Sequence, residues 1–194
     1  VQMKRSIIIA LVFMLCFPSI SQAQKFGVKT NLAYWATTTP NLGVEVALGP
    51  RVTFHLSGGY NPWTLNDDPA VNMKMKHFLV SPEFRYWFCN SFQGHFMGIN
   101  ANYAEYNVGA IPIPTIEGSE NRRYEGWAAA AGLTYGYSWI LGKRWNLEAT
   151  IGLGCWYTEY DAFENRKCGL FQSSGSQIAF GPTRIGLSFI YMIK

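Results

Sequence analysis

Apolar and polar residues alternate with a period of two along most of the chain, most clearly from Leu133 to Gly154. Odd positions there are bulky and apolar, such as Tyr135 and Trp145, whereas even positions are small or polar and include a column of glycines and Glu148. A period of two predicts extended strands, because successive side chains point to opposite faces. The five residues 140–144 between the two runs are short enough for a hairpin turn. Since a soluble sheet would turn charged residues, not glycines, toward water, the hairpin predicts a membrane barrel.

The same alternation recurs in six other stretches. With the two strands of the hairpin, which begin near Trp127 and Trp145, the expected strands are 25–34, 42–48, 52–59, 77–88, 94–108, 127–139, 145–154 and 183–193. Eight strands is the smallest common size for a membrane barrel. The sequence therefore predicts an all-β fold, an eight-stranded antiparallel up-and-down transmembrane β-barrel that occupies residues 24–194.

The connections between these strands alternate in length. Those near Gly49, 90–93 and 140–144 are short, whereas 64–76, 110–123 and 161–179 are long and polar. Short periplasmic turns and long extracellular loops are typical of outer-membrane barrels. The three long segments are therefore expected to face outward, where they could bind an extracellular protein or glycan.

Aromatic residues gather at the ends of the expected strands. We expect five of them to lie at the two lipid–water boundaries: Tyr34, Trp63, Trp87, Trp139 and Trp145. Aromatic girdles at both interfaces are a feature of membrane barrels, in contact with the lipid of the outer membrane.

The N-terminus has the layout of a secretory signal peptide. Lys4 and Arg5 precede an apolar run over 7–17, and the small residues Ser21 and Ala23 suit a cleavage site. This run is too short for a membrane-spanning helix, which needs about 20 residues. We expect residues 1–23 to be removed and the mature protein to be exported to a Gram-negative envelope, whether translation starts at Val1 or Met3.

Composition excludes several classes of function. Charged residues make up 14% of the chain and aromatic residues 16%, and the formal charge of +4 falls to +2 once Lys4 and Arg5 are removed. So small a charge gives no reason to expect nucleic-acid binding. Cys89, Cys155 and Cys168 have no metal-binding spacing, so neither a metal nor a cofactor is expected. Whether Cys155 and Cys168 form a disulfide stays open.

The polar face carries charges of both signs, which are expected inside the barrel. This expected interior set is Lys29, Glu45, His55, Glu83, Arg85, Glu148 and Arg184. Buried charges need partners, and the lumen of an eight-stranded barrel is filled by side chains. The favoured interpretation is a plugged interior of ion pairs; a narrow solute path is the alternative.

One constellation on this face could serve catalysis. Glu45, His55 and Ser57 supply a carboxylate, a base and a nucleophile on paper, as in a lipid-modifying deacylase. They would point into a plugged lumen rather than at lipid, so a core histidine hydrogen-bonded to Glu45 is the favoured interpretation and no catalytic residue is assigned.

Several sequence blocks carry a resemblance to a known family. These blocks are Lys29-Thr30-Asn31-Leu32, Pro40-Asn41-Leu42-Gly43-Val44-Glu45, Ser57-Gly58-Gly59-Tyr60-Asn61-Pro62-Trp63, Pro82-Glu83-Phe84-Arg85-Tyr86-Trp87, Arg144-Trp145-Asn146-Leu147-Glu148 and Gly181-Pro182-Thr183. In these blocks the chain resembles an uncharacterised outer-membrane β-barrel family of Bacteroidota-type bacteria, a domain-of-unknown-function family similar in architecture to small OmpA- and OmpX-type barrels. The resemblance implies outer-membrane location and no assigned activity. It departs from the wider pattern at the C-terminus, which ends in Lys194 rather than in an aromatic residue.

The leading hypothesis is therefore a non-enzymatic outer-membrane barrel that stabilises the envelope or binds at the cell surface. An enzyme that modifies envelope lipid, a narrow solute channel and a soluble exported barrel with an apolar cavity are the competing hypotheses. Neither a ligand nor an oligomeric state follows from the sequence.

Overall fold

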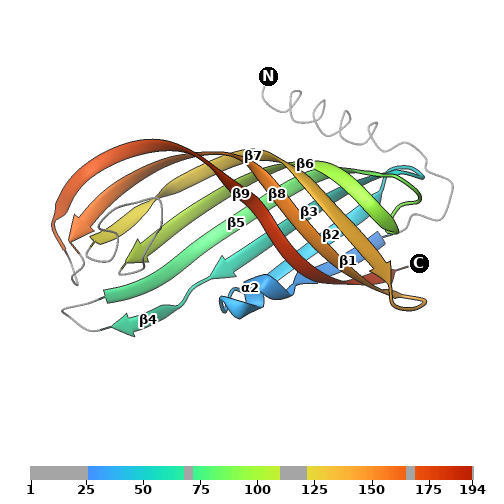
Figure 1. Cartoon of the computed structure of the whole chain (residues 1–194). Coiled ribbons are helices and arrows are strands. Elements are labelled where there is room, and N and C mark those ends of the chain that lie inside the picture. The colour runs from blue at the N-terminus through green and yellow to red at the C-terminus, as the bar shows by residue number, and fades with distance from the viewer. Residues whose placement is uncertain (1–25, 68–71, 110–121, 165–168, 194) are drawn as a thin grey trace, which may run out of the picture.

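The computed structural model describes residues 26–67, 72–109, 122–164 and 169–193 (Figure 1). In chain order the elements are β1 (Phe26–Asn31), α2 (Leu32–Ala36), β2 (Asn41–Ala47), β3 (Val52–Asn61), β4 (Thr64–Asp67), β5 (Asn72–Trp87), β6 (Gly94–Gly109), β7 (Arg122–Ile140), β8 (Trp145–Glu164) and β9 (Phe171–Ile193). Within this part of the chain, the five-residue α2 is the one α-helix, and no helix is long and apolar enough to cross a membrane.

The strands form one antiparallel sheet that closes on itself. The order is β3-β2-β1-β9-β8-β7-β6-β5-β4, and a further pairing of β3 with β5 completes the ring. The short β4 pairs with β5 just beyond the end of β3, so it extends the wall and is not a ninth member of the ring. The prediction of eight antiparallel strands in up-and-down order is confirmed.

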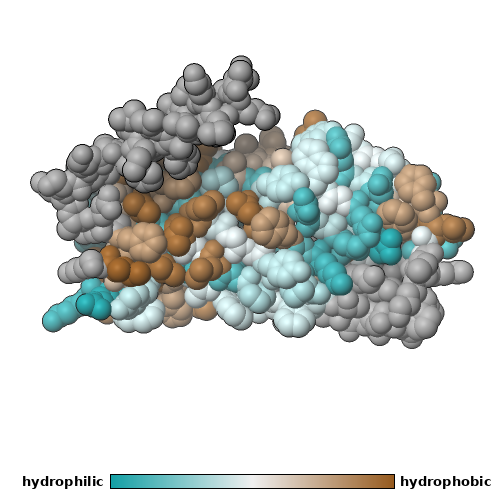
Figure 2. All heavy atoms as spheres, turned by 180° about the vertical axis from the view of Figure 1, so that it is seen from behind, coloured by the Kyte–Doolittle hydropathy of each residue, from teal (hydrophilic) through white to brown (hydrophobic). Residues whose placement is uncertain are grey.

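The two faces of this sheet have the polarity that the alternation predicts. In the β7–β8 hairpin, Leu133 pairs with Leu153 and Tyr135 with Ile151, and all four side chains are exposed. The adjacent Thr134 on β7 and Thr150 on β8 point to the opposite face and are buried. Among the described residues, nineteen polar or charged side chains are buried against nine hydrophobic ones, so the ring has a polar interior and an apolar exterior. Figure 2 shows apolar residues gathered over one part of an outer face and hydrophilic residues over another.

We call the end of the ring that carries the short connections 48–51, 88–93 and 141–144 the turn end, and the opposite end the loop end. At the loop end the strands are longer than the sequence predicts. The predicted loop 161–179 is wrong for most of its length, because β8 continues to Glu164 and β9 already begins at Phe171. Most of the predicted loop 64–76 likewise belongs to β4 and β5, whereas 110–121 lies outside the described residues. Residues 161–164 and 172–177 carry no regular run of apolar residues on one face, so these extensions lack the alternation from which strands were predicted.

The predicted first strand, 25–34, is also wrong at its end. Asn31 terminates β1 and caps α2, because its side-chain oxygen accepts a hydrogen bond from the Ala33 backbone amide at 3.1 Å. Tyr34 therefore lies on a helix at the loop end, and not on a strand at the lipid boundary. Its side chain is half-buried; burial raises the pKa of Tyr34, and the nearby positive charge of Arg184 opposes that rise.

A candidate functional site inside the barrel

The seven residues of the expected interior set lie together in the middle of the ring, and Arg85 on β5 is at their centre. Its guanidinium donates to Glu83 Oε2 at 2.7 Å, to Glu45 Oε2 at 3.0 Å and to Glu148 Oε2 at 2.9 Å. Glu45 and Glu148 lie on β2 and β8, so one side chain links three strands across the lumen. Five N–H donors in a rigid fork make arginine suited to bridging several carboxylates at once.

Lys29 on β1 joins the same carboxylates from the other side. Its ammonium group lies 2.8 Å from Glu148 Oε2 and also forms an ion pair with Glu45. Glu45 accepts a further hydrogen bond, of 2.5 Å, from the Thr53 hydroxyl. All of these side chains are almost completely buried.

Arg184 joins the layer from β9, at the edge of an irregularity in that strand. Gly152 pairs with Arg184 but Leu153 pairs with Pro182, so Thr183 is an extra residue in β9. The Arg184 guanidinium donates to Glu83 Oε2 at 2.9 Å and to Ser57 Oγ at 3.0 Å.

His55 on β3 completes the layer. Its Nδ1 atom lies 3.2 Å from Arg184 Nη2 and 3.3 Å from Glu83 Oε2. The expectation that His55 pairs with Glu45 is wrong. The two residues are opposite each other in the β2–β3 ladder, but Glu45 is held by Lys29, Thr53 and Arg85.

The charged layer is electrically balanced. Three cations (Lys29, Arg85 and Arg184) face three carboxylates (Glu45, Glu83 and Glu148). Isolated charges in a low-dielectric interior are costly, and mutual pairing with full hydrogen bonding offsets that cost. Glu83 Oε1 is buried and has no hydrogen-bond partner among the residues that the structure describes.

An apolar group fills the lumen between this layer and the turn end. This plug consists of Trp87, Phe92, Phe96, Ile190 and Met192, all buried. The Trp87 and Phe96 ring centroids are 4.6 Å apart, and the Arg85 guanidinium lies 4.4 Å above the Phe96 ring. The plug is therefore continuous with the charged layer.

Phe92 enters the plug from the β5–β6 connection. Its backbone has a φ of 67°, and its carbonyl oxygen accepts hydrogen bonds from Asn146 at 2.7 Å and Ser138 at 3.2 Å. These two bonds from the wall hold the connection inside the turn end of the ring.

The prediction that Trp87 lies at the lipid boundary is wrong. Trp87 has the same strand parity as Glu83 and Arg85, so it points inward; it is fully buried and donates to the Thr53 hydroxyl at 3.0 Å. By contrast, Trp139 and Trp145 lie on the outer face at the turn end, and Trp63 is exposed at the loop end. The place of Trp87 in the odd–even alternation of β5, and not its being a tryptophan, therefore decides which face it lies on.

The catalytic constellation does not assemble. Among the described residues, the Ser57 hydroxyl contacts the Ser81 carbonyl and the Arg184 guanidinium, with no hydrogen bond to His55. His55 in turn contacts Glu83 rather than Glu45.

The plug is what the sequence interpretation missed. Phe96 lies two and four positions before Gly98 and Asn100, and Ile190 two positions after Ser188. The period of two therefore already placed Phe96 and Ile190 on the inner face. Phe92 had no such signal, because it lies in a turn.

Comparison with known proteins identifies a family. A family model described as "Protein of unknown function (DUF3575)" matches residues 7–193, nearly the whole chain. No curated protein and no solved structure matches the chain.

Proposed function

Because the chain belongs to the DUF3575 family, whose description assigns no activity, we propose from the geometry of the ring alone that the protein is a non-enzymatic outer-membrane β-barrel. Its charge-paired interior is plugged, and its loop end is turned to the outside. The observation that carries the proposal is the apolar band around the outer face. Exposed large hydrophobic residues occur on every strand of the ring except β1, whose outward residues are half-buried.

The band has the height that a membrane requires. On β8 the outward residues from Trp145 to Tyr157 carry no charge, and the next outward residue is Glu159. These twelve steps, at about 3.3 Å each and with a strand tilt of about 40°, span roughly 30 Å. The hydrocarbon core of a bilayer is about 30 Å thick. A soluble protein would have to expose the same band to water, which is far more apolar surface than such proteins leave uncovered.

The interior supports a structural role over conduction. A solute passing along the lumen would meet the charged layer, in which every cation is held by carboxylates, and then the plug. Neither layer leaves an unpaired cation among the described residues to attract an anion.

We further propose that residues 1–23 are a cleaved signal peptide, that the source is a Bacteroidota-type bacterium, and that the architecture is similar to that of small OmpA- and OmpX-type barrels. On this proposal the protein stabilises the envelope or binds an extracellular protein or glycan at its loop end, through the segments 64–76, 110–123 and 161–179, which are expected from the sequence to face outward. The mass of the protein recovered from cells tests the cleavage: a start near Gln24 is expected, and retention of residues 1–23 would contradict it.

Gel migration tests the barrel in its membrane. We expect the detergent-folded protein to migrate differently in SDS before and after boiling, because a closed ring resists SDS at room temperature. We also expect it in the outer-membrane fraction of cells. Recovery from the soluble periplasm without detergent, together with identical migration before and after boiling, would refute the proposal.

Two cysteines provide a test of the band itself. Cys89 is exposed at the turn end, whereas Cys155 is exposed on the outer face of β8 inside the band. In a C168S variant inserted in phosphatidylcholine vesicles, a water-soluble maleimide that has access to both sides should label Cys89 and spare Cys155. Equal labelling of both thiols in a folded protein would place the band in water.

A further inference from the structure

Three aromatic side chains form a row where the apolar band ends on the loop side. Tyr103 on β6, Trp127 on β7 and Tyr157 on β8 all point outward from neighbouring strands. The ring centroids of Tyr103 and Trp127 are 6.2 Å apart with planes inclined by only 25°, and those of Trp127 and Tyr157 are 5.6 Å apart. The row is thus a partly exposed aromatic platform.

Two carboxylates on the loop side orient this row. Tyr103 donates its hydroxyl to Glu105 at 2.9 Å. Glu159 accepts from the Trp127 indole N–H at 3.2 Å and from the Tyr157 hydroxyl at 2.5 Å. We call Tyr103, Glu105, Trp127, Tyr157 and Glu159 the ledge. Hydrogen bonds to charged acceptors are the stronger ones, so they hold the three rings in place.

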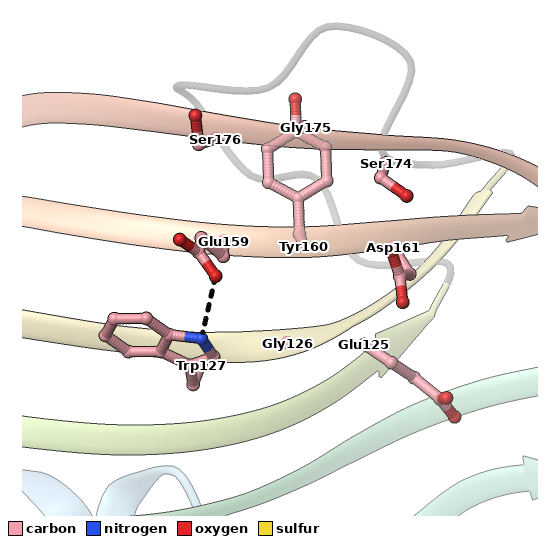
Figure 3. Close-up of a pocket in the computed structure, with 9 residues that line it drawn as sticks. All are labelled: Glu125, Gly126, Trp127, Glu159, Tyr160, Asp161, Ser174, Gly175 and Ser176. Carbon is pink, nitrogen blue, oxygen red and sulfur yellow. Dashed lines mark hydrogen bonds between the residues drawn. The ribbon is translucent and has the colours of Figure 1, made fainter.

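Hollows flank Trp127 on both sides. One, of about 410 Å³, is lined by residues of β7, β8 and β9 that include Glu125, Asp161 and Ser176 (Figure 3). The other, of about 540 Å³, lies toward β5 and includes Tyr60 and Lys76. In Figure 3 the Trp127 ring and the Glu159 carboxylate meet at the edge of the first hollow, joined by their hydrogen bond. Volumes of 300–1,000 Å³ are typical of small-molecule sites.

We propose that the ledge binds the uncharged sugar head group of a membrane glycolipid. This inference rests on the proposed membrane location. Aromatic faces stack against the C–H faces of sugar rings, and carboxylate oxygens accept hydrogen bonds from sugar hydroxyls. The apolar band lies directly below the row, so the acyl chains of the same molecule would continue down the barrel wall. A free sugar has no acyl chains and would not contact the apolar band below the row.

The charge around the ledge selects against an anionic head group. The ledge itself carries two carboxylates, Glu105 and Glu159, and Glu125 and Asp161 line the hollows beside it. Among the side chains that the structure describes, two cations lie nearby: Arg123 is paired with Glu125, at 3.4 Å, and Lys76 lines the second hollow. A phosphate placed here would meet net negative charge, whereas neutral hydroxyl groups would find acceptors.

Lipid enrichment in nanodiscs tests the inference. The protein without residues 1–23 is inserted into phosphatidylcholine nanodiscs that contain small equal amounts of diglucosyl diacylglycerol and phosphatidylglycerol. Native mass spectrometry then counts the lipids that remain bound. We expect retention of the diglucosyl lipid over phosphatidylglycerol, and a loss of about tenfold in Trp127→Ala, which removes the central ring and corresponds to about 1.4 kcal/mol. Glu159→Gln keeps the shape of the side chain but weakens the acceptor, so a smaller loss is expected.

Trp139→Ala is the matched control. Trp139 lies on the same face of β7, twelve residues from Trp127, with its ring centroid 4.8 Å from that of Tyr137, but it is at the turn end. Its substitution should leave glycolipid retention unchanged. An equal loss in Trp139→Ala would show that any girdle tryptophan suffices and would overturn the inference.

Three other results would also overturn it: equal retention of phosphatidylglycerol, full competition by millimolar free maltose, or loss of the glycolipid on chelation of divalent cations, which would make a bridging ion the true contact. Insertion is measured separately by the gel shift. A protein that fails to insert refutes the membrane proposal, and the inference with it, whereas insertion without glycolipid retention refutes the inference alone.

Discussion

Replacing Arg85 by methionine tests whether the charged layer holds the ring together. Methionine keeps most of the buried stem but removes the guanidinium that contacts Glu45, Glu83 and Glu148. The interior would then hold three carboxylates and two cations. Removing one partner of a buried ion pair costs about 3–5 kcal/mol, because the remaining charge stays buried without compensation. We expect the free energy of unfolding to fall by about that amount, measured by urea titration of the folded protein with tryptophan fluorescence and gel migration.

The double variant R85M/E148Q separates charge balance from packing. It returns the interior to zero net charge and leaves two ion-paired groups, one around Lys29 and one around Arg184. It should therefore be more stable than R85M, despite having lost a second charged group. Arg144→Met is the control: Arg144 is exposed and contacts the Tyr191 hydroxyl at 3.0 Å, so its loss should cost less than about 0.5 kcal/mol. The reasoning fails if R85M costs less than about 1 kcal/mol, or if E148Q added to R85M destabilises further.

Two further predictions concern packing and orientation. Gly136→Ala should destabilise the protein by about 1–3 kcal/mol, because an added Cβ would lie 2.7 Å from the Ala149 carbonyl oxygen and against the plug. Gly142→Ala, at a turn with nothing within 4 Å, should not; equal urea midpoints would contradict this account. In vesicles that contain brominated lipid, the fluorescence of Trp139 should be quenched and that of Trp87 spared, each measured in a variant that keeps only that tryptophan. Quenching of Trp87 would put it outside the ring.

The sequence was sufficient to predict the ring because the signal it relied on is geometric. Strict alternation identifies the inner face of each strand, and the three cations and three carboxylates of the charged layer all follow from it. Where residue type was preferred over alternation the prediction failed. Trp87 was assigned to the boundary because tryptophan favours interfaces, although its parity with Arg85 points inward.

Other features depend on contacts that alternation does not encode. The end of β1 is set by one side-chain cap from Asn31, which any asparagine in a strand could resemble. The far ends of β8 and β9 carry no regular run of apolar residues on one face, so no period distinguishes them from loops. The entry of Phe92 into the lumen depends on acceptor contacts with Ser138 and Asn146, which are distant in sequence. The partner of His55 depends on which side chains reach it across the lumen: Glu83 approaches from β5, and Arg184 from β9.

The distribution of the six charges along the chain has a consequence for how the ring assembles. Of these six charges, the first half of the chain, through β5, brings two cations and two carboxylates, and the second half brings one of each. The layer charges of each half therefore cancel before the halves meet. Several of the contacts that join the halves run between residues more than a hundred positions apart, such as Lys29 to Glu148 and Arg184 to Glu83. They can form only when β9 closes on β1. These contacts therefore stabilise the ring only at the last step of assembly, so we expect slow folding. Opening of the ring must first break the same contacts, so we expect a long-lived native state.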